Sequence, residues 1–325
     1  MKAVRLLVTL LVLAPGLLQA QALPQTSLAV QHDGAWHTWW VSSHAPAEWR
    51  AALPELSRAV EWRRTGTGID VAELALSGDG TAWRLDVVLV RIDPRHVRLK
   101  LEEAVRDAGM RGAWTVDSLP ADAALALNAG QFTGAVPWGW LVRGGREVKA
   151  PGTGSLSMAF VIDTSGAVRF VHADAIDALR GDARIAEAFQ SYPVLLRDGE
   201  VPPQLRAAER GVDVSHRDSR LAIGQLRDGR ILIALTRFGA LGEAAGSLPF
   251  GPTTPEMAAL MGALGCHTAM LLDGGLSAQL AVRAGNGRAR IWNGWRRVPL
   301  ALIGYPRSGY SPRAHHSTTS SGNRR

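Results

Sequence analysis

The chain has 325 residues, of which 46% are hydrophobic and 20% charged, with a formal net charge of +7. Two basic residues precede an apolar N-terminal run, and four arginines follow residue 304 in a stretch without acids, so little of this charge remains for the rest of the chain. No basic face is predicted, and nucleic-acid binding therefore lacks an electrostatic basis. Cys266 is the only cysteine, which excludes an internal disulfide and cysteine-rich zinc sites, and we expect it to be a small buried residue.

Residues 1–22 are typical of a cleaved export signal. The apolar run from Leu6 to Leu18 is followed by Ala20-Gln-Ala22, the small-x-small pattern that signal peptidase accepts. A transmembrane anchor is the competing interpretation, but the run is short and contains Pro15-Gly16, whereas a spanning helix needs about 20 apolar residues. We expect an exported protein, periplasmic or secreted, with no membrane anchor after cleavage.

Residues 23–80 are rich in tryptophan. Stacked tryptophans can form a carbohydrate platform, but large aromatic side chains more often fill cores, and no repeat supports a binding module. We expect this segment to pack on an α+β domain over residues 81–305, built from mixed, largely antiparallel β-sheets with a few helices. Residues 306–325 are predicted to be a disordered basic tail.

Alternation of apolar and polar residues predicts strands in the middle of the chain. Residues 83–89 and 97–101 alternate on either side of Asp93-Pro94, which indicates two adjacent antiparallel strands. A second pair is expected on either side of Asp228-Gly229, a strong hairpin signal. The other predicted elements are strands over residues 121–127, 156–162 and 192–196, and a helix over residues 182–189.

Residues 133–155 contain many glycines and show little periodicity. A loop of this length inside a compact domain is usually functional or mobile. We expect it to form a wall or lid over a cleft, with Trp138 and Trp140 stacking on sugars. The alternative is a surface loop that is pinned by buried tryptophans.

The clearest helix begins at Thr253. Thr253 and Glu256 have the spacing of a capping box, Pro255 lies in the first turn, apolar residues follow on one face, and Gly265 ends the helix. This helix leads into a predicted buried strand over residues 268–272.

That strand ends abruptly in Asp273-Gly-Gly-Leu-Ser277. Gly274 and Gly275 have no Cβ, so a ligand can approach the main chain closely beside a fixed carboxylate. The alternative is an ordinary turn in which Asp273 bonds neighbouring amides. Asn128-Ala-Gly130 similarly follows a short apolar strand.

Five motifs follow one another along the chain: Asn128-Ala-Gly-Gln-Phe132, Pro193 to Gly199, Arg220 to Gly224, Thr253 to Ala258, and Leu264 to Ser277. Taken in this order, they resemble the phosphodiester glycosidase family over roughly residues 85–305. Two departures from the family pattern are Leu276, where many relatives carry a third glycine, and Thr236-Arg237, near which relatives carry Asp-Gly-Arg. Leu276 narrows the space that a glycine leaves open, which bears on the substrate.

The resemblance implies a hydrolase that cleaves the bond between sugar C1 and phosphate in a glycosyl-1-phosphodiester, N-acetylhexosamine-like, of envelope or extracellular glycans. Such cleavage passes through an oxocarbenium-like state, and a phosphate leaves well without a proton, so one carboxylate and one guanidinium can suffice. Asp273 is then the nucleophile, base or electrostatic stabiliser, and Glu256 is the candidate second carboxylate, although its capping box explains it structurally. The expected substrate-binding residues are Arg220 for the phosphate, Asn128 for the sugar, and Gly130, Gly274, Gly275, Ser277, Trp138 and Trp140.

A phosphorylated carbohydrate is thus the predicted partner, without cofactor or metal, since no D-x-[DN]-x-[DN]-G loop is present. A serine hydrolase is disfavoured because Ala278 departs from the nucleophile-elbow motif and a strand is expected where that motif requires a helix. The stronger alternative is a non-catalytic protein that binds or exports envelope polysaccharide, because the same cleft could hold a phosphorylated glycan without cutting it.

Overall fold

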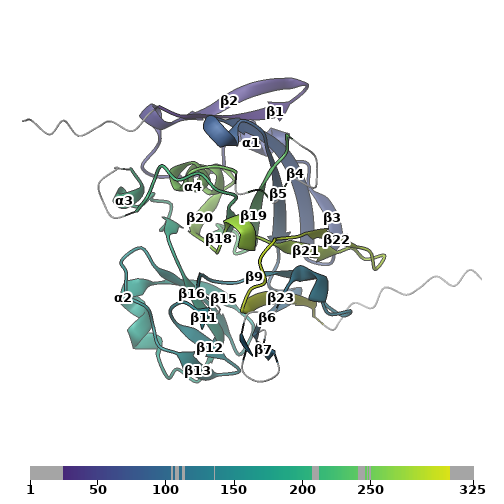
Figure 1. The fold of residues 1–325 in the computed structure, drawn as a ribbon, viewed down its shortest axis with the longest axis vertical. Helices are drawn as coiled ribbons and strands as arrows, with labels where there is room; N and C mark the ends of the chain where they lie inside the picture. The colour runs from purple at the N-terminus through teal and green to yellow at the C-terminus, as the bar shows by residue number, and fades with distance from the viewer. Residues whose placement is uncertain are drawn as a thin grey trace, which may run out of the picture.

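The structure, a computed structural model, describes residues 25–307 apart from 104, 107–109, 112–113, 135, 207–211, 241–245, 247 and 249. A nine-stranded sheet and two five-stranded sheets dominate it, with few helices, as Figure 1 shows. Every strand pair in these residues is antiparallel, which confirms the α+β class. No helix of the described part is long and apolar enough to cross a membrane. The expected export signal and most of the tail lie outside the described residues.

The nine-stranded sheet contains the tryptophan-rich N-terminal segment, which joins the sheet as four of its strands instead of only covering it. Trp40 and Trp49 are buried, in accord with a packing role. In spatial order the strands are β17 (Val194–Leu196), β20 (Cys266–Leu271), β18 (Leu221–Leu226), β19 (Ile231–Phe238), β5 (Leu85–Ile92), β4 (Ile69–Gly78), β1 (Ser27–His32) and β2 (Ala35–Val41), with β3 (Arg63–Gly66) paired to β4.

Two five-stranded sheets lie against the large one. The first, which we call the wall sheet, has the order β13 (Arg146–Lys149), β12 (Leu141–Arg143), β16 (Ile185–Ser191), β14 (Met158–Asp163) and β15 (Val168–His172). The second, the bridging sheet, has the order β22 (Ala289–Trp292), β21 (Leu280–Arg283), β9 (Leu125–Asn128), β23 (Leu300–Pro306) and β6 (Val97–Glu103). Two short ribbons complete the strands: β7 (Val105–Arg106) with β8 (Met110–Arg111), and β10 (Phe132–Thr133) with β11 (Val136–Pro137).

The helices are short. They are α1 (Pro54–Ala59), α2 (Ala173–Ile176), α3 (Pro203–Arg206) and α4 (Thr254–Ala263), with 3-10 turns that include η7 (Gly275–Ser277). Helix α4 packs on β17 and β20, whereas α2 lies beside the wall sheet in the lower half of Figure 1.

Strand β5 shows how the layers are held together, because both of its faces are buried. Val87 and Leu89 belong to the apolar cluster that includes α4, whereas Val88 and Val90 belong to the cluster shared with the two smaller sheets. Full burial of such side chains contributes about 1.5–3 kcal/mol each. The large sheet is therefore covered by helices on one face and by the smaller sheets on the other.

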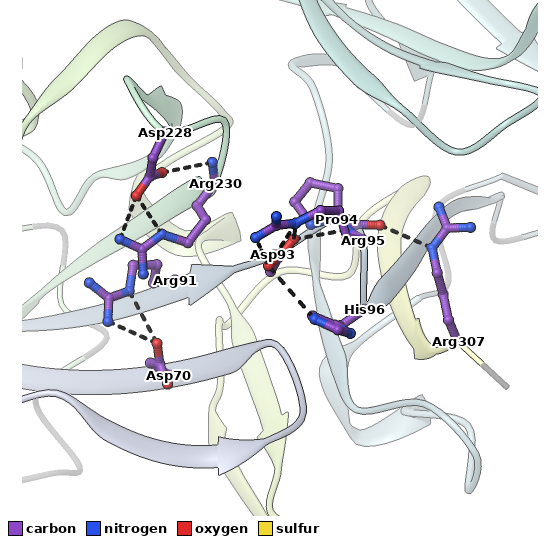
Figure 2. Close-up of polar contacts among 9 residues, drawn as sticks. All are labelled: Asp70, Arg91, Asp93, Pro94, Arg95, His96, Asp228, Arg230 and Arg307. Atoms are coloured by element: carbon purple, nitrogen blue, oxygen red, sulfur yellow. Dashed lines mark hydrogen bonds and ion pairs between the residues drawn. The ribbon is translucent and has the colours of Figure 1, made fainter. Parts of the chain in front are cut away.

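The predicted pairing of the strands around Asp93-Pro94 is wrong. Strand β5 already pairs with β4 on one edge and with β19 on the other, so β6 crosses to the bridging sheet and pairs with β23. Asp93 fixes the crossing: its amide donates to the Gly68 carbonyl, and its carboxylate accepts hydrogen bonds from Arg95, as Figure 2 shows for the Arg95 contacts.

The predicted helix over residues 182–189 is also wrong, because most of this segment forms β16. Asp182 caps a turn by accepting bonds from Arg184, whose guanidinium lowers the pKa of Asp182 to about 2. The chain then runs between β12 and β14, which bond both of its edges. Pairing on two edges outweighs the local helical preference.

The folded chain also extends slightly further than expected. Pro306 belongs to β23, and the Nε atom of Arg307 donates to the Pro94 carbonyl at 3.0 Å (Figure 2). The other arginines drawn there have acidic partners: Arg91 bonds Asp70, and Arg230 bonds Asp228. Paired in this way, these arginines do not form an uncompensated basic face.

Candidate functional site

A cavity of about 690 Å³ lies where β18 and β20 of the large sheet meet loops of the wall sheet. Its ionisable lining consists of Asp213, Asp218, Arg220 and Asp273, and its rim includes Trp138 and Tyr192. Four of the residues expected at the site therefore line one cavity: Trp138, Arg220, Asp273 and Gly274.

Asp273 is fixed through its main chain. Its amide donates to the Gly130 carbonyl at 2.8 Å, and its own carbonyl accepts a bond from the Asn128 side chain at 2.9 Å. Burial raises the pKa of its carboxyl; a hydrogen bond with Ser277 and the positive charge of Arg296 oppose that rise, and the charge of Asp218 adds to it. A clamped carboxylate with a raised pKa is suited to proton transfer.

The two glycines after Asp273 are required by close packing. A Cβ on Gly274 would lie 2.5 Å from the Ser219 carbonyl oxygen, and one on Gly275 would lie 2.7 Å from a carboxylate oxygen of Asp218. Gly275 also has φ +55°, a conformation that side chains disfavour. Gly275 thus leaves the space that a second acid, Asp218, occupies.

That second acid, Asp218, was not found from the sequence. It lines the cavity, accepts a bond from the Ser219 amide at 2.8 Å, and lies 3.7 Å from His216. Burial raises the pKa of the Asp218 carboxyl, and Arg220 partly offsets the rise. The available signal was a run of polar and charged residues directly before the buried strand β18.

Arg220 is aimed by backbone groups. Its Nε atom donates to the Pro252 carbonyl at 3.1 Å, and Nη2 donates to the His216 carbonyl at 2.5 Å. Burial lowers the pKa of Arg220 and the negative charge of Asp218 raises it, but a guanidinium stays protonated in proteins. It is therefore a fixed positive charge at the cavity.

Part of the glycine-rich loop forms a wall of the cavity, together with Tyr192. The rings of Trp138 and Tyr192 pack edge to face with centroids 4.8 Å apart. Trp138 lies so close to Gly152 that a Cβ there would be 2.7 Å from the indole. The buried Gln190 accepts bonds from the Trp140 and Gly152 amides and so ties the loop to β16.

The structure assigns Trp140 a packing role in place of the expected sugar contact. Its side chain is 1% exposed, and its indole donates to Glu147 at 2.9 Å. Of the two loop tryptophans, only Trp138 lines the cavity.

Asn128 and Gly130 lie behind Asp273 and do not line the cavity. Asn128 is fully buried, and its amide oxygen accepts a bond from the Gln279 amide while its nitrogen bonds Asp273. With both ends of the amide bonded to backbone, Asn128 positions Asp273, which departs from the sugar contact expected of it. Gly130 supports the same residue through its carbonyl, and its φ of +74° explains the glycine. Ser277, 2% exposed, likewise acts on Asp273.

Glu256 is not at the cavity. The predicted capping box with Thr253 is present, and both carboxylate oxygens bond Arg217, at 2.7 and 2.9 Å. The side chain is fully buried. Its capping role and ion pair account for Glu256. Of the other cavity carboxylates, Asp218 shares the raised pKa of Asp273, whereas hydrogen bonds from Ser215 lower the pKa of Asp213.

The thiol of Cys266 does not line the cavity. Across the described residues, no group of three or more histidine, cysteine, aspartate or glutamate side chains is arranged to hold a metal ion. Cys266 is buried, as expected, and burial raises the pKa of its thiol.

Solved structures with a similar fold include a hypothetical protein from Synechocystis, with 16% identity and a TM-score of 0.50, which covers 76% of this chain. The alignment spans 64% of the Synechocystis chain, less than two thirds of its length. The catalytic domain of zebrafish N-acetylglucosamine-1-phosphodiester alpha-N-acetylglucosaminidase, auto-inhibited by its pro-peptide, has 18% identity and a TM-score of 0.54, with 79% of this chain and 87% of that one covered. At these identities the similarity establishes the fold alone.

No curated protein matches the sequence. The sequence pattern of the phosphodiester glycosidase family, however, matches residues 121–303, more than half of the chain and the part that contains Asp218, Arg220 and Asp273. The chain therefore belongs to the phosphodiester glycosidase family.

Proposed function

We propose that this chain is an exported hydrolase that cleaves the bond between sugar C1 and phosphate in a glycosyl-1-phosphodiester, with an N-acetylhexosamine-like sugar from an envelope or extracellular glycan. The observation that carries the proposal is one cavity lined by two carboxylates with raised pKa values, Asp218 and Asp273, and one fixed guanidinium, Arg220. The family and the shared fold support the reaction class, and the N-terminal pattern supports export.

The charges of the site suit an anionic substrate. Each carboxylate has an arginine that opposes the rise of its pKa, Arg220 for Asp218 and Arg296 for Asp273. Burial is the main cause of both raised pKa values, and the charge of Asp218 adds a smaller rise to the pKa of Asp273. A phosphodiester brings one more negative charge, which the fixed guanidinium of Arg220 can bind through its planar fork.

We assign the reacting groups as follows. Water attacks C1 and passes its proton to the carboxylate of Asp273, while the C1–O bond breaks and its electron pair stays on the phosphate oxygen. The phosphate needs no proton to leave, so Asp218 serves to set the charge of the pair and to position water. The sugar ring is proposed to rest against Trp138 and Tyr192 at the rim.

The test is a panel of N-acetylhexosamine-1-phosphodiesters, including nucleotide sugars, assayed for release of free sugar and phosphomonoester. Asp273→Asn is expected to lower kcat by about 10²–10⁴, the usual contribution of general acid–base catalysis. Asp218→Asn is expected to lower kcat by about 10², the usual effect of a misplaced reacting group. Both variants should retain substrate binding, because Arg220 and the aromatic rim are unchanged. Asp177→Asn is the matched control, since that carboxylate is 82% exposed and lies after α2.

Failure of the wild-type protein to release sugar from every compound in the panel would refute the proposal. If it binds these compounds without turnover, and Asp273→Asn binds them equally well, the non-catalytic polysaccharide-binding alternative is correct instead.

A further inference from the structure

An exposed aromatic side chain lies beside the turn that carries Asp273. Trp295 is 61% exposed, the highest value for any large hydrophobic side chain in the described residues, and Leu276 is 38% exposed. The amides of Trp295 and Arg296 both donate to the Leu276 carbonyl, each at 2.8 Å. The loop 293–297 is thus bonded directly to the Asp-Gly-Gly turn, on residues that do not line the cavity.

Close packing makes this attachment rigid. Gly294 sits so near the turn that a Cβ there would lie 2.9 Å from the Leu276 oxygen and 3.1 Å from the Ala278 oxygen. The fully buried Gln279 also reaches the loop, because its side-chain nitrogen donates to the Arg296 carbonyl at 3.1 Å.

The same buried amides connect the loop to Asp273. Gln279 donates its backbone amide to Asn128 at 3.0 Å, and Asn128 donates to the Asp273 carbonyl at 2.9 Å. A continuous chain of bonds therefore runs from Asp273 through Asn128 and Gln279 to Arg296. The backbone that carries the exposed indole of Trp295 is thus held at a fixed place relative to the reacting carboxylate.

The charge of the loop matches an anionic chain. Arg296 and Arg297 are exposed and follow Trp295 directly. The charge of Arg296 reaches the site, since it partly opposes the rise that burial gives to the pKa of the Asp273 carboxyl. An aromatic ring beside guanidinium groups suits a ligand in which sugar faces alternate with phosphates, because rings stack on sugars and arginines bind phosphates.

We propose that loop 293–297, with Leu276, is a second sugar–phosphate subsite that binds the repeat next to the one being cleaved. The substrate class is then a glycan chain whose sugars are joined by phosphodiesters, and not a single small glycosyl phosphodiester. This inference rests on the proposed function. The proposed subsite is continuous with the cavity, because Leu276 lies three residues after Asp273. The glycan would extend from the cavity across the Asp-Gly-Gly turn.

The test compares two synthetic probes: N-acetylglucosamine 1-(methyl phosphate) as a single repeat, and a trimer of N-acetylglucosamine joined by 1,6-phosphodiesters. Wild-type protein is expected to cleave the trimer with kcat/KM about tenfold higher. Trp295→Ala should remove this preference by raising KM for the trimer about tenfold, because the variant loses the ring on which the neighbouring sugar stacks. It should leave KM for the single repeat within twofold.

Trp83→Ala is the matched control. Trp83 is 51% exposed and also has a neighbouring arginine, Arg84, at 5.8 Å from its ring centre, but it has no bond to the Asp273 turn. Trp83→Ala should change kcat/KM for neither probe. Equal effects of Trp295→Ala on both probes would indicate a merely structural role, and no effect on the trimer would likewise overturn the inference.

Binding separates this inference from the proposed function. In the Asp273→Asn background, calorimetry should show about tenfold weaker trimer binding when Trp295 is replaced by alanine. Trp295-dependent trimer binding without any turnover in the wild type refutes the hydrolase and retains the subsite. Turnover that does not depend on Trp295 refutes the subsite and retains the hydrolase. Absence of both trimer binding and turnover refutes the hydrolase and the subsite together.

Discussion

Replacement of Gly275 by alanine separates backbone strain from damage to the carboxylate pair. The φ of +55° costs an alanine about 1–2 kcal/mol, and the new Cβ would lie 2.7 Å from Oδ2 of Asp218. That oxygen must retreat by roughly 0.7 Å to reach an ordinary van der Waals distance of about 3.4 Å. The carboxylate cannot move freely, because its other oxygen accepts the Ser219 amide.

A displacement approaching 1 Å in a reacting group can cost on the order of 10² in rate. We therefore expect Gly275→Ala to lower kcat/KM on the best glycosyl-1-phosphodiester by about 10- to 100-fold, and to lower stability by about 1–2 kcal/mol. Both quantities are measured on one preparation, by sugar release and by urea denaturation.

Gly287→Ala supplies the control. Gly287 has φ +83°, and nothing lies within 4 Å of its would-be Cβ. It should lose similar stability and keep its activity. If Gly275→Ala loses stability but no activity, then Asp218 does not take part in the reaction, and the reasoning is refuted.

Three further predictions concern buried polar groups. Arg217→Met leaves Glu256 buried without its cation and should lower the free energy of unfolding, measured in urea, by about 3–5 kcal/mol. The double variant Arg217→Met, Glu256→Gln should recover most of that loss. Equal losses in the two variants would contradict the prediction. Burial raises the folded-state pKa of Asp218, so the contribution of this residue to stability is lost as pH rises through that pKa. Asp218→Asn should therefore be more stable than wild type at pH 7.5, and the difference should narrow toward pH 4. A gain in stability that is confined to acid pH would contradict this prediction. Gln190→Leu leaves the Trp140 and Gly152 amides without their acceptor and should lower the free energy of unfolding by about 2 kcal/mol or more. It should also raise KM with little change in kcat. An unchanged KM would show that the loop does not contact the substrate.

Local patterns in the sequence predicted the elements whose signals are local. The capping box at Thr253, the hairpin at Asp228-Gly229 and the strand that ends in Asp273 were all found, because each depends on residues a few positions apart. Strands β5 and β6 were expected to pair across Asp93-Pro94, but the partners of β5 are distant in sequence, and alternation does not say which edge is free.

The candidate site was only half predictable for the same reason. Asp273 and Arg220 stand in motifs, but Asp218 stands in an irregular polar run whose position depends on Gly275, 57 residues later. Trp140 and Glu256 carry side chains of the right chemistry, yet each has its partner in the protein, Glu147 and Arg217. Residue type indicates what a side chain can do, whereas burial decides whether a substrate can reach it.

Each of the three sheets contributes a different part of the cavity. The acids and Arg220 come from the large sheet, the rim with Trp138 and Tyr192 from the wall sheet, and the amides behind Asp273 from the bridging sheet. If the proposed function holds, insertions or exchanges in the wall loops would alter which sugar is accepted while Asp218, Arg220 and Asp273 keep their supports. A transplant of those loops between relatives becomes a practical route to new specificity, with the chemistry inherited unchanged.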